Sequence, residues 1–264
     1  HMNRLESRLQ ALRASGSTGL VTYFTAGDPD FASSLALLSQ LGAAGADIIE
    51  LGMPFSDPVA DGPVIQQAHL RALAAGQDQI RTLELVTALR QQDNQTPVVL
   101  MGYLNPLLQF GVARFMAQAA QAGVDGLLLV DLPVEHAATY REAARAHGIL
   151  LIAMTAPGSD EARLQRVLAD AAGFVYHVSI NGITGATGKT AAELAPTVAR
   201  IRRHTPLPVA LGFGIREVAQ LAALRHSADL LVVGSALVAM LAESGAEAAL
   251  ARVSQMAAVL KNEG

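Results

Sequence analysis

Short apolar runs recur along the chain at regular intervals. Eight of them are candidate strands, over residues 20–24, 48–51, 98–101, 126–130, 149–153, 174–178, 209–211 and 230–233. Most are apolar at every position rather than at alternate positions, which is typical of strands covered on both faces. The pattern therefore predicts parallel strands buried between other elements.

The segments between these runs carry apolar residues at helical spacing. We expect helices over residues 31–44, 64–75, 112–122, 134–147, 160–171, 191–203 and 217–224, and an extra N-terminal helix over 3–15. Gly123, Gly148 and Gly173 stand just before strands, where helix C-caps belong. Eight β-then-α units in about 250 residues favour a (β/α)8 TIM barrel. No linker divides the chain, so we expect residues 1–264 to form a single domain.

A doubly wound open sheet is the competing fold. It usually has five to seven strands and a glycine-rich first turn of the form GxGxxG. The first turn here reads Thr25-Ala26-Gly27-Asp28-Pro29, which does not fit. The barrel is therefore favoured, and its active site is expected in the loops that follow the C-terminal ends of the strands.

Composition excludes several classes of protein. The chain of 264 residues is 51% hydrophobic with a net charge of −4, which gives a large core and no positive field for nucleic acid or an anionic membrane. The absence of cysteine excludes disulfides and thiolate chemistry. No apolar run reaches the roughly 18 residues of a membrane span. We expect a soluble, cytoplasmic protein, and take His1-Met2 as a cloning remnant.

Glu50 is the most informative residue, because it stands inside an apolar strand. A carboxylate there is costly unless it is paired or protonated. Strand alternation places Ile48, Glu50 and Gly52 on one face, so Glu50 points into the barrel if the other face meets the helices. Desolvation would then raise its pKa and allow proton donation near neutral pH. A purely structural Glu that caps loop amides is the alternative, and spacing alone leaves both open.

Asp57 and Asp61 lie on the loop that follows Glu50. Loop aspartates usually cap turns or helices, and Asp61-Gly62-Pro63 precedes the predicted helix over 64–75. Taken singly, either Asp is better explained as structural. Three acids on one segment at the barrel mouth instead favour a functional site, since carboxylates in different environments can divide proton-transfer work.

The later loops suggest an anion site. Gly188-Lys189-Thr190 does not complete a P-loop, because Ile183 stands where that motif requires glycine. Gly214, Gly234 and Ser235 follow the last two strands, where TIM barrels often bind phosphate on backbone amides and a helix N-terminus.

The positions of the histidines and lysines argue against a metal site and against Schiff-base chemistry. The histidines form neither HxH nor HExxH, so no metal site is predicted. His177 faces away from Tyr176 on its strand, and we expect it to pack behind the barrel. Neither Lys189 nor Lys261 lies at a strand end, where a Schiff-base aldolase would carry its lysine.

At this point the motifs match a family. The stretch from Glu50 to Pro63 closely resembles the signature of the tryptophan synthase α subunit family. The similarity extends over nearly the whole chain and includes Phe24–Pro29, Leu70–Gly76, Asp131–Pro133, Gly182–Gly185, Gly212–Ile215 and Gly234-Ser235.

This resemblance implies a lyase that cleaves indole-3-glycerol phosphate to indole and glyceraldehyde 3-phosphate by a retro-aldol reaction. Glu50 would protonate indole C3 and shuttle the proton of the glycerol hydroxyl, and Asp61 would interact with the indole N–H. The substrate-binding residues implied by the family are Tyr23, Leu128, Ile152, Tyr176, Thr184, Gly185, Phe213, Gly214, Gly234 and Ser235.

The resemblance also implies a partner. The chain would dock on a tryptophan synthase β subunit in an αββα heterotetramer, and Asp57 would take part in communication with β. No cofactor is expected in this chain, and pyridoxal phosphate is expected only in β. Two alternatives are a phosphoribosyl isomerase, whose acid and base on strands one and five are missing here, and a non-catalytic phosphosugar sensor. The intact Glu50 and Asp61 argue against the sensor.

Overall fold

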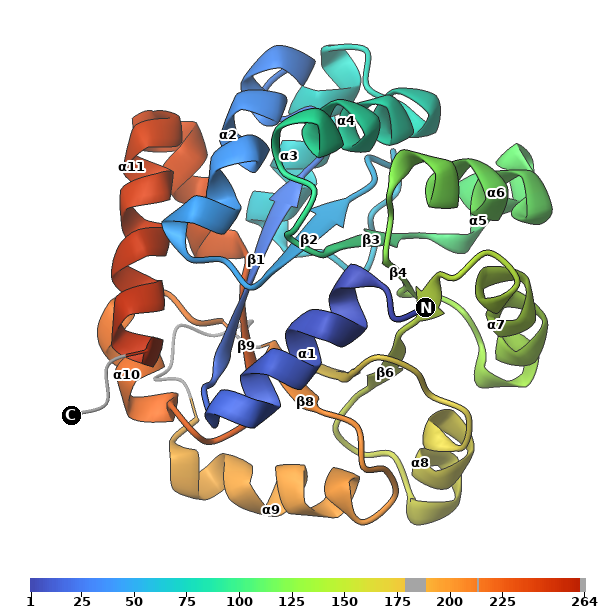
Figure 1. Ribbon diagram of the computed structural model, residues 1–264, viewed down its shortest axis with the longest axis vertical. Coiled ribbons are helices and arrows are strands. Elements are labelled where there is room, and N and C mark those ends of the chain that lie inside the picture. The colour runs from blue at the N-terminus through green and yellow to red at the C-terminus, as the bar shows by residue number, and fades with distance from the viewer. Residues whose placement is uncertain (179–188, 213, 262–264) are drawn as a thin grey trace.

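The computed structural model describes residues 1–178, 189–212 and 214–261, in which helices surround a barrel of parallel strands (Figure 1). The strands are β1 Gly19–Thr25, β2 Ile48–Gly52, β3 Val98–Gly102, β4 Gly126–Leu129, β5 Leu150–Leu151, β6 Ala153–Thr155, β7 Val175–Val178, β8 Val209–Gly212 and β9 Leu230–Val233. Each predicted strand is present, and the fifth is divided into β5 and β6.

The helices alternate with the strands, as the sequence predicts. They are α1 Arg4–Ser15, α2 Phe31–Ala44, α3 Pro63–Ala74, α4 Gln79–Gln92, α5 Leu104–Phe110, α6 Val112–Ala122, η1 Val134–His136, α7 Ala137–Arg145, α8 Glu161–Leu168, α9 Ala191–Arg202, α10 Val218–Leu224 and α11 Ser235–Lys261. The predicted bounds of α2 and α6 are confirmed. The sequence does not predict α4 or α5, and the helix expected over 134–147 is divided into a 3-10 turn and a shorter α7.

The barrel closes through the divided strand. The sheet order is β5-β4-β3-β2-β1-β9-β8-β7-β6, and every pairing is parallel. β5 pairs with β4 and β6 pairs with β7, while Ile152 between them donates its amide to Leu127 O at 2.8 Å. One strand therefore bends at Ile152 and joins both edges, which confirms the (β/α)8 TIM barrel.

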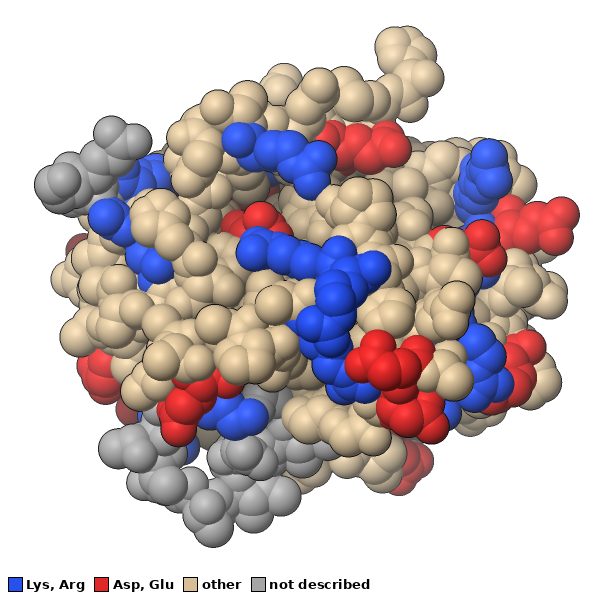
Figure 2. All heavy atoms as spheres, turned by 90° about the horizontal axis from the view of Figure 1, so that it is seen from below, with Lys and Arg blue, Asp and Glu red and all other residues tan. Residues whose placement is uncertain are grey.

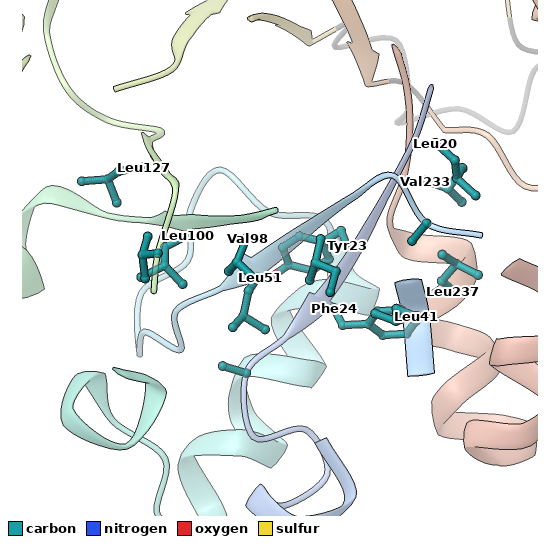
Figure 3. Packing of buried hydrophobic residues seen from close by; sticks show 14 of the residues in the cluster. Leu20, Tyr23, Phe24, Leu41, Leu51, Val98, Leu100, Leu127, Val233 and Leu237 are labelled. Carbon is teal, nitrogen blue, oxygen red and sulfur yellow. The ribbon is translucent and has the colours of Figure 1, made fainter. Parts of the chain in front are cut away.

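The two faces of the strands build separate apolar layers. Outward side chains pack under the helices, and Figure 3 shows Phe24 of β1 beside Leu41 of α2. Inward side chains fill the barrel, and this inner layer comprises Val21, Ile48, Val99, Leu128, Ile152, Phe174, Tyr176, Ala210, Leu230 and Val232. Coverage on both faces explains why the strands are apolar at nearly every position.

Helix α1 closes the N-terminal end of the barrel. Asn3 caps it through a capping box with Glu6, and Leu5 and Leu9 pack into the inner layer. Because this end is sealed, an open site can form only at the opposite end, which we call the mouth.

Within residues 1–178, 189–212 and 214–261, no helix is both long and apolar enough to cross a bilayer. On the face shown in Figure 2, Lys and Arg side chains are interspersed with Asp and Glu rather than gathered into a field of one sign.

Candidate active site

Glu50 lies on the inner face of β2 and is only 2% exposed. It is in register with Tyr23 of β1 and Val99 of β3, and Val99 belongs to the inner layer. Burial raises the pKa of Glu50 to about 8, and the negative charge of Asp61 adds to the rise. No hydrogen bond to another described residue opposes this shift. The inward orientation predicted from strand alternation is confirmed, and Glu50 is suited to carry a proton near neutral pH.

Asp61 is held firmly at the mouth by donors from two other segments. Its Oδ2 accepts the Tyr103 hydroxyl at 2.8 Å and lies 3.2 Å from Nε2 of His69. Gln66 donates its side-chain amide to the Asp61 carbonyl at 2.8 Å. Burial, followed by the charge of Asp61, raises the pKa of Tyr103, so its hydroxyl remains a proton donor.

The structural interpretation of Asp61 as a helix cap is wrong. Helix α3 begins at Pro63, and its N-cap is Gly62, which makes no side-chain cap hydrogen bond. Proline at the first helical position needs no amide acceptor, so α3 can begin without a carboxylate. The Asp61 side chain, 8% exposed, points to Tyr103 and His69 instead.

Asp57 stands on the same loop in a different environment. It is exposed, and its nearest described side-chain partner is the Ser56 hydroxyl at 3.1 Å. It therefore does not join the cluster of Asp61, Tyr103 and His69.

Two tyrosines lie near Glu50, Tyr23 on the neighbouring strand β1 and Tyr176 on β7. Tyr23 and Tyr176 are both buried, and burial raises the pKa of each well above its usual value. Glu50 contributes to both shifts, which places the two phenols around its carboxyl.

Glycines at neighbouring strand ends make room for these rings. A Cβ added at Gly52 would collide with the Tyr23 hydroxyl, and one at Gly212 would collide with the Tyr176 hydroxyl. Each glycine lies two residues beyond the strand partner of its tyrosine, on the same inner face. The sequence shows these glycines but not the rings that they accommodate.

The remaining predicted substrate-binding residues lie in two places. Leu128 and Ile152 belong to the inner layer. Gly234 follows β9, and a Cβ there would touch the Tyr23 side chain at 3.5 Å, while Ser235 begins α11. A Cβ at Gly214 would meet no described atom within 4 Å. Three further predicted substrate-binding residues lie outside the described part of the chain: Thr184, Gly185 and Phe213.

His177 packs behind the barrel, as predicted. Its Nδ1 is 2.9 Å from the Thr155 hydroxyl, and burial, aided by Lys189, lowers its pKa to about 4. Together with Thr155 and Lys189 it lines a cavity of about 160 Å³ outside the strands. Strand alternation puts this cavity on the opposite face of β7 from Tyr176, away from Glu50.

The contacts of His69 and Tyr103 with the Asp61 carboxylate were not predicted from the sequence. His69 lies on α3 and Tyr103 follows β3, so only the closed barrel brings them to one carboxylate. No local spacing signals this convergence.

Comparisons with known proteins identify the family of this chain. The family model described as tryptophan synthase alpha chain matches residues 9–263. The tryptophan synthase alpha chain of Legionella pneumophila subsp. pneumophila is 37% identical, with 100% of this chain and 99% of that chain covered and a TM-score of 0.91.

Two further solved structures are similar over the same extent. A structure of tryptophan synthase from M. tuberculosis, in an open form with BRD0059 bound, is 34% identical over 99% of this chain and 100% of that chain, with a TM-score of 0.89. A protein from Aquifex aeolicus VF5 is 31% identical over 99% and 100% of the two chains, with a TM-score of 0.90. The chain belongs to the tryptophan synthase alpha chain family, lyases that cleave indole-3-glycerol phosphate to indole and glyceraldehyde 3-phosphate.

Proposed function

We propose that Glu50 and Asp61 are the two catalytic carboxylates of this cleavage. The observation that carries the proposal is the fully buried Glu50 carboxyl, whose pKa is raised to about 8 beside a second, firmly held carboxylate. A proton donor and a fixed negative charge at one barrel mouth are what a retro-aldol reaction of an indole requires.

The chemistry divides between the two acids as follows. Glu50 donates its proton to indole C3, and the ring becomes cationic with the charge shared by its nitrogen. Asp61 accepts a hydrogen bond from the ring N–H and stabilises that charge. Glu50, now ionised, takes the proton of the neighbouring glycerol hydroxyl. The oxygen forms the aldehyde C=O, the bond from that carbon to C3 breaks, and its electron pair returns to the ring. Because the protonated ring accepts these electrons, the step needs no cofactor in this chain.

The inner layer offers an apolar pocket for the indole ring. Tyr23 is in register with Glu50, and Tyr176, Leu128 and Ile152 belong to the inner layer. All four are buried and would exclude water from the reacting atoms. Excluding water also strengthens the attraction between Asp61 and the cationic ring.

The phosphate would bind at the ends of β8 and β9. Gly214 and Gly234 allow close backbone approach, and the first amides of α11, beginning at Ser235, lack partners within the helix. Thr184, Gly185 and Phe213 complete the proposed set of substrate-binding residues.

A β subunit is the proposed partner, in an αββα heterotetramer that holds pyridoxal phosphate in β, and the cytoplasm is the proposed location. Similarity to a structure of tryptophan synthase from M. tuberculosis supports the partnership. The exposed Asp57 would transmit the state of β to the loop that carries Asp61.

The proposal is tested by measuring indole released from indole-3-glycerol phosphate by the purified chain, with and without a β subunit. Turnover that is stimulated by β is the expected result. No indole release under either condition would reject the lyase assignment and leave the sensor alternative.

Asp57 has its own test in the same assay. Asp57→Ala should leave turnover of the isolated chain close to normal and reduce its stimulation by β, because the side chain makes no described contact with Asp61 or Glu50. Normal stimulation of this variant would remove Asp57 from communication with β.

A further inference from the structure

His69 is a buried histidine whose two ring nitrogens both have partners on the catalytic loop. It lies on α3 and is 2% exposed. Its Nδ1 is 3.0 Å from the backbone nitrogen of Phe55, and its Nε2 is 3.2 Å from Oδ2 of Asp61. One ring therefore ties the start of the loop to its end.

These partners determine the tautomer of the ring. A backbone amide can only donate, so Nδ1 must present a lone pair to the amide of Phe55. The ring is then neutral, and its proton is on Nε2, which donates to Asp61.

The consequence for Asp61 is a fixed orientation with its charge preserved. Oδ2 receives the His69 Nε2–H and the Tyr103 hydroxyl, and Ala60 donates its amide to the Tyr103 oxygen at 3.0 Å. Among the described residues no donor reaches Oδ1, so this oxygen is the one left to accept the substrate N–H. Both donors are neutral, so neither cancels the negative charge as an arginine would.

We propose that His69, as the neutral Nε2–H tautomer, is a positioning residue that works with Tyr103 to aim Oδ1 of Asp61 at the substrate. This inference rests on the proposed function, because it assigns Asp61 to the reaction. The inference goes beyond the proposed function because it predicts that turnover depends on Nε2 of His69, a residue that does not touch the substrate.

Three substitutions separate the two ring nitrogens. His69→Gln can place an N–H where Nε2 lies, His69→Asn can place an acceptor where Nδ1 lies, and His69→Leu supplies neither. Loss of one hydrogen bond to a carboxylate corresponds to about a 10- to 100-fold loss of kcat. We expect His69→Leu and His69→Asn to show this loss with KM nearly unchanged, and His69→Gln to recover most of it.

The opposite order of turnover rates among the His69 variants would overturn the proposal. If His69→Asn turned over as fast as wild type and His69→Gln did not, His69 would serve only to anchor the loop through Phe55. His147→Gln is the matched control, because His147 is exposed and its loss should change neither kcat nor KM. Should His69→Leu fail to fold, the Gln and Asn variants still decide the question.

Failure of the inference and failure of the proposed function give different results. A wild-type chain that releases no indole rejects the function, whereas an active chain with equal His69→Gln and His69→Asn rates rejects only the positioning role. A ¹⁵N NMR spectrum of the His69 ring tests the tautomer without any turnover. We expect an unprotonated Nδ1 and a protonated Nε2, and the reverse pattern would contradict the hydrogen-bond assignment.

Discussion

The two ends of the barrel bury carboxylates in opposite ways. At the closed end, Asp125 is 1% exposed and accepts hydrogen bonds from Arg90 at 2.9 Å, Arg4 at 3.2 Å and the Val98 amide at 2.9 Å. At the mouth, Glu50 is buried to the same degree, and its only described electrostatic neighbour of consequence is another acid.

The difference lies in what opposes the cost of desolvation. Burial raises the pKa of Asp125 and of Asp47, but a backbone amide and nearby cations offset part of each rise. The cations are Arg90 and Arg4 for Asp125, and Lys261 and Arg8 for Asp47. For Glu50, burial and Asp61 act in the same direction. Since α1 supplies Arg4 and Arg8 to the closed end, the acids there are paired and connect α1 to the barrel. The mouth instead retains an unpaired acid that can exchange a proton.

The largest expected effect is on turnover at the mouth. Glu50→Gln keeps the shape of the side chain but removes the proton donor, so kcat should fall about 10³- to 10⁴-fold. Glu142→Gln, an exposed change of the same type on α7, is the matched control. Near-normal turnover of Glu50→Gln in a steady-state indole assay would refute the assignment.

Stability should depend on pH through the same residue. Glu50 binds its proton more tightly in the folded state, so its contribution is full below the ordinary pKa of 4.5 and is lost as pH rises through about 8. The whole difference corresponds to about 5 kcal/mol. Urea unfolding should therefore show wild type losing stability relative to Glu50→Gln over this window. Parallel profiles would mean that Glu50 titrates normally.

Asp61→Asn tests the fixed charge beside Glu50. The amide oxygen should occupy the place of Oδ2 under Tyr103 and His69, which turns an NH2 group toward the substrate N–H. We expect kcat to fall about 10²- to 10³-fold. Asp160→Asn removes the same charge at the N-cap of α8, where Asn also caps well, and should have no effect. Equal rates for the two variants would exclude Asp61 from the reaction.

The closed end should respond in stability rather than in turnover. Arg90→Met removes the buried partner of Asp125 and should lower the free energy of unfolding by about 3 kcal/mol, while the folded fraction keeps its kcat. Arg141→Met breaks the exposed pair with Asp170 and should cost less than about 1 kcal/mol. A change in kcat for Arg90→Met, with stability unaltered, would contradict the assignment of a structural role to the acids of the closed end.

The sequence predicts the strands and the orientation of Glu50 better than it predicts which distant segments come into contact. Continuous apolar runs reveal buried parallel strands, and alternation alone orients Glu50 inward. The bend at Ile152 is not visible, because β5 and β6 together read as one apolar run.

The support of Asp61 could not be predicted either. Its partners His69 and Tyr103 are 8 and 42 residues away along the chain, and nothing in the local spacing joins them. Asp61 instead resembles a helix cap in sequence, and only the tertiary fold shows that Gly62 occupies that position.

The central claim is that the unpaired acid at the mouth is protonated near neutral pH, while the paired acids at the closed end are tied to arginines. It is tested most directly by a ¹³C NMR titration of the Glu50 carboxyl in the purified chain, with Glu50→Gln used to assign the signal. A midpoint near 8 is the predicted result. A midpoint at the ordinary glutamate value of 4.5 would contradict the account, because an ionised Glu50 could not deliver a proton to the substrate.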